Sequence, residues 1–197
     1  MATQGPNYPS GASDGGGSYA WSSPSNILTS NDVRASVSVP GPGYIESNKL
    51  YITGFGFSIP SGATIDGILA EWEVYADSTG PGGTYPIGLT KNGTTIAADS
   101  GASKSIASGP PDIAQSQGGA TDKWTGGGYS GVWTDSEINA STFGLVLGIY
   151  GTAAVTVSFD FARLTIYYTA AAAGQPAMRR MGGVPGMLGA GRLGRSW

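Results

Sequence analysis

The sequence predicts an all-β protein, an antiparallel two-sheet sandwich of jelly-roll or immunoglobulin-like type with about eight strands. Two observations carry this prediction. Glycine accounts for 34 of the 197 residues and charged residues for only 12%, which is typical of a chain with many turns and neutral faces. Short apolar runs alternate with polar residues at a period of two and end at Gly or Pro, and no run is long enough for an extended helix. We expect a sandwich domain over 21–169, a flexible N-terminal arm over 1–20 and an extended tail over 170–197.

Residues 50–74 form the centre of the predicted core. Apolar side chains change parity at Gly54, from Leu50 and Ile52 to Phe55 and its alternating successors. Because one extra residue turns every later side chain to the opposite face, the switch predicts a β-bulge. After a Pro-Ser-Gly turn, the second half of the stretch alternates again and indicates a strand with one buried face.

The remaining elements follow from local patterns. The pair Asn92-Gly93 in 86–97 predicts a hairpin with a type I′ turn, and the small, polar stretch 98–120 indicates a long loop. Thr134 followed by Glu137 matches a capping box and predicts one helical turn. Two apolar runs over 143–169 predict a closing hairpin, with a second bulge near Ala162 where the parity changes.

The absent residue types restrict the chemistry. The chain has no Cys and no His, which excludes disulfides, thiolate nucleophiles, imidazole bases and the commonest zinc ligands. Asp66, Asp77 and Asp160 lack the spacing of a calcium loop. We therefore predict no catalytic residue, no cofactor and no metal site. The chain also shows neither a signal peptide nor an apolar run that could cross a membrane, so we expect a soluble protein made in a cytoplasm.

Charge divides the chain into two parts. All 13 acidic residues and six of the ten basic residues lie in 1–169, which gives that part a net charge of −7, while the four remaining arginines give 170–197 a charge of +4. Glycines in this tail separate apolar residues from the arginines, a pattern suited to an extended segment laid on an acidic partner. A disordered terminus is the alternative. Four arginines are weak evidence for nucleic-acid binding, so we expect none. The predicted contact residues are Met178, Arg179, Arg180, Met181, Met187, Leu188, Arg192, Leu193, Arg195 and Trp197.

Two further sets of residues are candidate sites. Trp124, Tyr129 and Trp133 surround a glycine run and would form an aromatic platform for a saccharide, although aromatic residues beside a turn also seal the ends of sandwiches. Glu71 and Glu73 lie two residues apart on one strand, so their carboxylates share a face, as paired acid and base groups do in glycosidases. The simpler interpretation of this pair is a solvated face.

The sequence also resembles a family of small bacteriophage β-sandwich proteins. The resemblance rests on Trp21, the run 55–68, the turn from Trp133 to Ile138, Phe143 to Val146 and the last strand, 159–169. It implies a non-enzymatic structural protein of the virion, found in capsid decoration (cement) proteins or tail components. The implied partners are the major capsid protein or other virion subunits. Sparse charge on the strand edges predicts a homo-oligomer, for which we expect a trimer. A tail or fibre module that binds host saccharide and, more remotely, a glycosidase are the alternatives.

Overall fold

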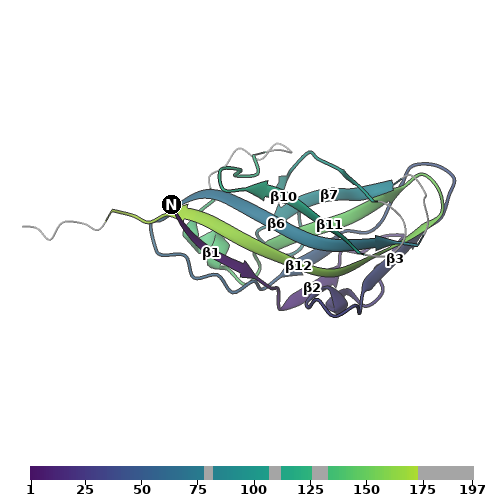
Figure 1. Ribbon diagram of the computed structural model, residues 1–197, viewed down its shortest axis with the longest axis horizontal. Coiled ribbons are helices and arrows are strands. Elements are labelled where there is room, and N and C mark those ends of the chain that lie inside the picture. Colours follow the sequence, from purple (N-terminus) through teal and green to yellow (C-terminus); the bar gives the residue numbers. More distant parts are fainter. Residues whose placement is uncertain (78–81, 107–111, 126–132, 173–197) are drawn as a thin grey trace, which may run out of the picture.

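The protein is a sandwich of two antiparallel β-sheets, as the computed structural model shows for residues 1–77, 82–106, 112–125 and 133–172 (Figure 1). The predicted fold class is therefore confirmed. The two longest strands, of 15 and 13 residues, lie in the same sheet, and the inner faces of the two sheets pack on each other. No helix among the described residues is long and apolar enough to cross a membrane.

The first sheet, sheet A, is built around one long strand. Strand β12 pairs with β6 on one side, while its other side pairs with β3 near its start and with β1 near its end; β10 then extends the sheet beyond β6. The strands of sheet A are β1 (Ala2–Asn7), β3 (Ala35–Val39), β6 (Thr64–Ala76), β10 (Ile113–Gly119) and β12 (Val155–Thr169).

The second sheet, sheet B, has the order β2-β5-β11-β7-β8, with β4 also paired to β11 and β9 to β7. Its strands are β2 (Gly11–Asp14), β4 (Ile45–Glu46), β5 (Leu50–Thr53), β7 (Gly82–Thr90), β8 (Ala98–Asp99), β9 (Lys104–Ser105) and β11 (Gly144–Gly151). A short 3-10 helix, η1 (Pro24–Ile27), and one helical turn, α1 (Asp135–Asn139), lie outside the sheets.

The core lies between the sheets and is closed by aromatic side chains. On β6 and β12 the residues that alternate inwards are nearly inaccessible to water, and Trp21 stacks on Phe159 with 5.1 Å between ring centroids. At the other side of the core, Phe143 packs edge-on against Trp133, with 5.5 Å between centroids. Burying such side chains contributes about 1.5–3 kcal/mol each, so the alternation seen in the sequence provides much of the driving force for folding.

The prediction of a flexible N-terminal arm over 1–20 is wrong. Residues 2–7 pair with β12, and residues 11–14 pair with β5, so this segment contributes an edge strand to each sheet. Its sequence carries almost no apolar side chains, and it is held instead by backbone pairing and by polar contacts. Asp14, for example, accepts hydrogen bonds from the backbone N–H of Trp21 and from the Asn48 side chain.

Local predictions were confirmed in part. Thr134 and Glu137 form the capping box of α1, and β12 has a break in register between Phe159 and Ala162. The parity change at Gly54 is also present, since Phe55 is buried, but β5 ends at Thr53, so the switch lies just beyond the strand.

Two loop predictions need correction. The hairpin around Asn92-Gly93 exists as β7–β8, but only Gly93 has a positive φ, and the Asn92 side chain caps the loop by accepting from the N–H groups of Thr94 and Thr95. The turn is therefore wider than type I′. The predicted loop 98–120 instead contains β8, β9 and β10, because polar side chains are tolerated on edge strands with a wet outer face.

The close pairing of β5 with β11 gives a stability prediction. A Cβ on Gly144 would meet the backbone carbonyl of Ile52, whereas a Cβ on Gly119 would meet nothing. We expect Gly144→Ala to destabilise the fold by about 1–3 kcal/mol, because the neighbouring strand must shift. At about 2–4 °C for each kcal/mol, the loss is measurable as a lower melting temperature. Gly119→Ala is the control, and equal melting temperatures for the two variants would contradict the close packing.

Candidate binding groove on sheet A

The bulge in β12 re-aims two side chains on the face of sheet A. Phe159 is opposite Val74 and Ala162 is opposite Trp72, so Asp160 and Phe161 together stand opposite Glu73. Two residues facing one is the arrangement of a β-bulge, which bends its strand and is common beside functional sites. The parity change read from the sequence is thus the feature that builds this site.

A groove of about 360 Å³ lies over this bulge. It runs across the outer face of sheet A, because Glu71 and Glu73 alternate outwards on β6 while their neighbours Trp72 and Val74 point into the core. The groove is lined by Tyr8, Ser30, Glu71, Trp72, Glu73, Ala114, Gln115, Ser116, Phe161 and Arg163. Charged, amide, hydroxyl and aromatic groups therefore meet on one surface.

A two-point ion pair forms the floor of the groove. Arg163 donates from Nε and Nη2 to the two carboxylate oxygens of Glu71, at 3.0 and 2.9 Å. This interaction raises the pKa of Arg163 above its ordinary value. The guanidinium also lies 5.5 Å from the centre of the Phe161 ring, within the range of a cation–π contact. The pair of Arg163 and Glu71, called the Glu71–Arg163 fork below, is thereby held in one orientation, and both side chains remain partly exposed.

An exposed aromatic ring borders this pair. The Tyr8 ring packs at a tilt of 54° on Phe161, with 6.1 Å between centroids, and Tyr8 keeps 45% of its surface accessible. Tyr8 directly follows β1, an edge strand that the sequence did not predict, and the pairing of β1 with β12 brings the Tyr8 ring to the groove. An accessible aromatic face next to a carboxylate–guanidinium fork offers both stacking and directional hydrogen bonds.

Acidic groups gather at the other side of the bulge. Single carboxylate oxygens of Asp32, Asp112 and Asp160 all lie within 4.8 Å of one another. Arg34 pairs with Asp112 through both carboxylate oxygens and contacts Asp32 at 3.3 Å, and its hydrogen bonds to Asp112 raise its pKa. Burial, together with the charges of these three aspartates, raises the pKa of Glu73.

Trp124 and Trp133 do not form an aromatic platform for a saccharide; they seal the end of the sandwich, the alternative that the sequence left open. Trp124 and Trp133 are each only 1% exposed. Their indole N–H groups donate to the backbone carbonyls of Ile68 and Lys123, at 2.9 and 2.8 Å. These carbonyls satisfy the indole N–H groups without water, while the apolar rings seal the core and leave no face for a ligand. Tyr129, the third predicted member, lies outside the described residues.

The other predicted residues have different outcomes. Glu71 and Glu73 do share one face, and both line the groove. The tail residues from Met178 to Trp197 lie outside the described residues. Tyr8, Phe161 and Arg163 were not predicted as site residues, since each is a lone side chain in its own stretch; the bulge near Ala162 was the one sequence signal that pointed to this place.

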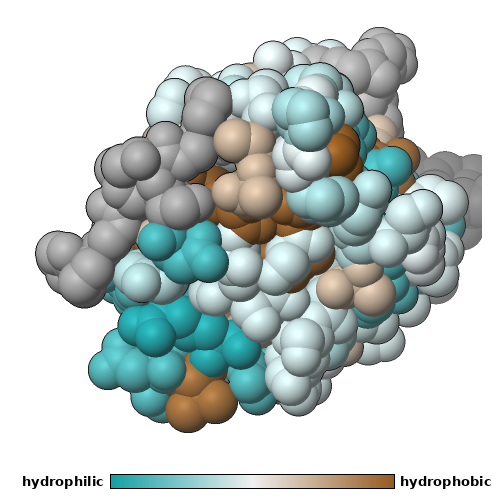
Figure 2. All heavy atoms as spheres, turned by 90° about the vertical axis from the view of Figure 1, so that its right-hand side faces the viewer, coloured by the Kyte–Doolittle hydropathy of each residue, from teal (hydrophilic) through white to brown (hydrophobic). Residues whose placement is uncertain are grey.

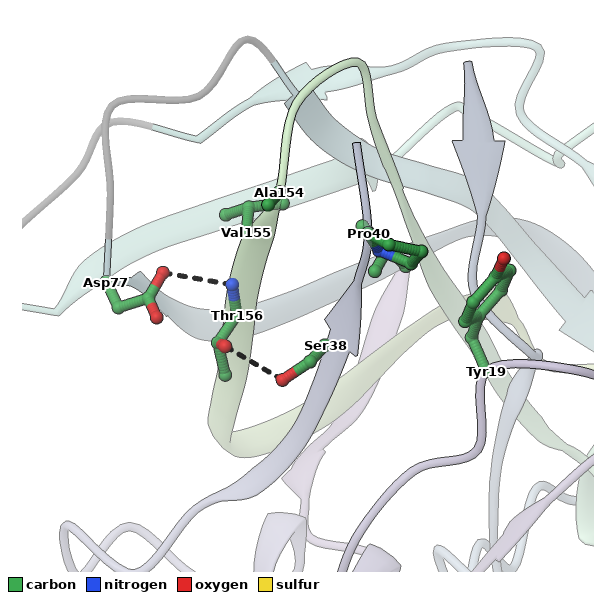
Figure 3. Close-up of a pocket in the computed structure, with 8 residues that line it drawn as sticks. Tyr19, Ser38, Pro40, Asp77, Ala154, Val155 and Thr156 are labelled. Atoms are coloured by element: carbon green, nitrogen blue, oxygen red, sulfur yellow. Dashed lines mark hydrogen bonds between the residues drawn. The ribbon is translucent and has the colours of Figure 1, made fainter. Parts of the chain in front are cut away.

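A second hollow lies at the end of the sandwich where β3 ends and β12 begins. It has a volume of about 590 Å³ and is lined in part by Val39, Pro40 and Val155. Apolar residues are exposed at this end of the molecule (Figure 2). Its polar groups satisfy one another, since Asp77 accepts from the Thr156 N–H at 2.9 Å and the Ser38 and Thr156 hydroxyls lie 2.8 Å apart (Figure 3). This hollow therefore offers apolar contact and few free hydrogen-bonding groups.

Comparisons with known proteins give no family. No family model matches the chain, and no curated protein matches it. Among solved structures, one described as "CBM4 structure and function" has 14% identity and a TM-score of 0.37, over 78% of this chain and 91% of that one. The glycoside hydrolase domain of Endo-D from Streptococcus pneumoniae R6 has 9% identity and a TM-score of 0.37, over 79% of this chain. The match spans 21% of that second chain. At these TM-scores neither likeness bears on function.

The raised pKa of Glu73 gives a pH-dependent prediction. Because the fold favours neutral Glu73, the stability that this group contributes is present below its unfolded pKa of about 4.3 and is lost as the pH rises through its higher folded pKa. Glu73→Gln keeps the neutral form. In buffer free of divalent cations, we expect its melting temperature to exceed that of the wild type at pH 7 and the difference to vanish below about pH 4. Glu46→Gln, on the far sheet, is the control; a pH-independent difference for Glu73→Gln would refute the assignment.

Proposed function

We propose that this protein is a non-enzymatic structural protein of a bacteriophage virion, a decoration or cement subunit that attaches to the capsid through residues 170–197. One observation carries the proposal: the domain begins and ends at the same end of the sandwich. Ala2 pairs with Tyr168, and Thr169 pairs with Thr64 (Figure 1). The basic segment therefore starts at one end of an acidic domain, while the hollow near Val155 lies at the other.

Charge and composition support attachment through this segment. The domain carries a net charge of −7 over 1–169, and the segment carries +4. The segment therefore suits an acidic surface of the major capsid protein or of another virion subunit better than it suits nucleic acid. Its apolar residues, Met178 and Trp197 among them, are of the types that anchor interfaces. The proposal places the protein on the virion as a homo-oligomer, a trimer in its simplest form.

The described residues support a non-catalytic role. Glu71 has both carboxylate oxygens engaged by Arg163, and the chain contains no His or Cys. A glycosidase would need one of the two glutamates to act as a free base or nucleophile. Glu73 by itself supplies a carboxyl group with a raised pKa but no partner in such a reaction.

A second candidate function is saccharide binding by the groove on sheet A, as in a tail or fibre module. The specific observation is the exposed Tyr8 ring beside the Glu71–Arg163 fork. Sugar rings stack on aromatic faces, and their vicinal hydroxyls match two-point hydrogen bonding by carboxylates and guanidinium groups. This candidate replaces the tryptophans of the original prediction with the residues that the structure exposes.

Deleting residues 173–197 tests the attachment. The sheets are complete within residues 1–172, so we expect a folded, soluble domain whose melting temperature is unchanged. Binding to purified, decoration-free phage particles, measured by co-sedimentation, should be lost. A matched full-length variant with the four tail arginines changed to Gln should bind less and with a weaker salt dependence. If the truncated protein still bound the particles at full occupancy, residues 173–197 would not be the anchor.

Tyr8→Ala tests the saccharide candidate. Removing a stacking ring that is 45% exposed should cost little stability. It should lower glycan-array binding by about two- to tenfold, since aromatic contacts contribute about 0.5–1.5 kcal/mol beyond area. Tyr44→Ala is the matched control, because Tyr44 is exposed on the opposite sheet. If the intact protein binds no glycan on the array, this candidate is discarded while the virion proposal stands.

A further inference from the structure

We propose that Asp32, Asp112 and Asp160 bind a calcium ion that ties together the segments beside the groove. The sequence offered no calcium motif, since the three residues are 80 and 48 positions apart in the chain. The fold brings them together from the loop after η1, from the start of β10 and from the bulge of β12. One oxygen from each lies within 4.8 Å of the others.

Asp160 provides the observation that points to a ligand. Its side chain is 1% exposed, yet among the described residues it accepts a single hydrogen bond, from the Asn31 N–H to Oδ1 at 3.3 Å. Its Oδ2 accepts none from the described part of the chain, and no described cationic side chain lies within 4 Å of it. Buried carboxylates are otherwise paired with a cation or coordinate a metal, because removing an isolated charge from water is costly.

Arg34 does not complete the cluster. Its guanidinium pairs with Asp112 and Asp32, which leaves Asp160 without an ion pair. The three carboxylates thus share one arginine, which leaves a local excess of two negative charges. A divalent cation would neutralise this excess.

The geometry favours calcium over magnesium. Three oxygens at the corners of a triangle with sides of 4.8 Å lie about 2.8 Å from its centre, so a small closure brings them to the calcium–oxygen distance of 2.3–2.6 Å, whereas the 2.0–2.1 Å of magnesium requires a larger one. Calcium takes six to eight oxygens, so bidentate carboxylates and water would fill the other positions. With only three protein residues as ligands, we expect a dissociation constant on the order of 10⁻⁴ M, in the range of extracellular calcium modules.

Calcium bound here would order one wall of the groove. Ser30 and Phe161 line the groove and are close in sequence to Asp32 and Asp160, while Glu73 is opposite the bulge. The ion would thus fix the loop after η1 against β12 and β10. This inference does not depend on the proposed function, because the ion is bound by the domain itself.

Thermal unfolding of the full-length, chelator-treated protein tests the site. At about 10 mM CaCl₂, roughly 100 times the expected dissociation constant, we expect the melting temperature to rise by about 5–10 °C. MgCl₂ at the same concentration, and NaCl at the same ionic strength, should give a clearly smaller rise. Isothermal titration with CaCl₂ should show one saturable site per chain.

Two variants and a control make the test specific. Asp160→Asn should melt higher than the wild type without calcium, since it removes a buried charge, and should lose the calcium-dependent rise. Asp32→Asn changes an exposed side chain, so it should fold normally and bind calcium several-fold more weakly. Glu46→Gln should behave like the wild type. The proposal would be overturned if the wild type showed no calcium-dependent rise in melting temperature, or if Asp160→Asn and Asp32→Asn both showed the same rise as the wild type.

Discussion

The pairing of β12 with three other strands is the interaction on which the rest of the structure depends. One edge of this 15-residue strand holds β3 and β1 in succession, and the other holds β6 along most of its length. Strands from the beginning, middle and end of the sequence are thereby joined in one sheet. Because β12 pairs with β1 at its far end, it also fixes the place where the chain enters and leaves the domain.

The same strand produces the groove through its irregularity. A regular β12 would alternate Asp160 and Phe161 between the core and the surface, and only one of them would face Glu73. The bulge instead sets both against β6, where Phe161 supports the Arg163 guanidinium and Asp160 approaches two other aspartates. A local departure from pairing is thus the origin of both the polar surface and the acidic cluster.

The two ends of the sandwich have different characters. At one end β1 begins beside the end of β12, from which the chain continues into the basic residues 170–197. The other end carries an apolar hollow whose polar groups are paired internally. The groove on sheet A lies between these ends, over the bulge of β12.

The sequence by itself determined the fold class, the capping box at Thr134 and the parity change near Ala162, because periodicity and capping are local properties. It misjudged residues 1–20 and 98–120, whose strands are held by backbone pairing with distant partners and not by apolar side chains of their own. For Trp124 and Trp133 it left two roles open, a surface platform or a seal at the end of the sandwich, and the structure shows the seal. Only the tertiary structure brought Tyr8 to Arg163 and Asp160 to Asp32 and Asp112, because contacts between residues so far apart in the chain depend on strand order and register.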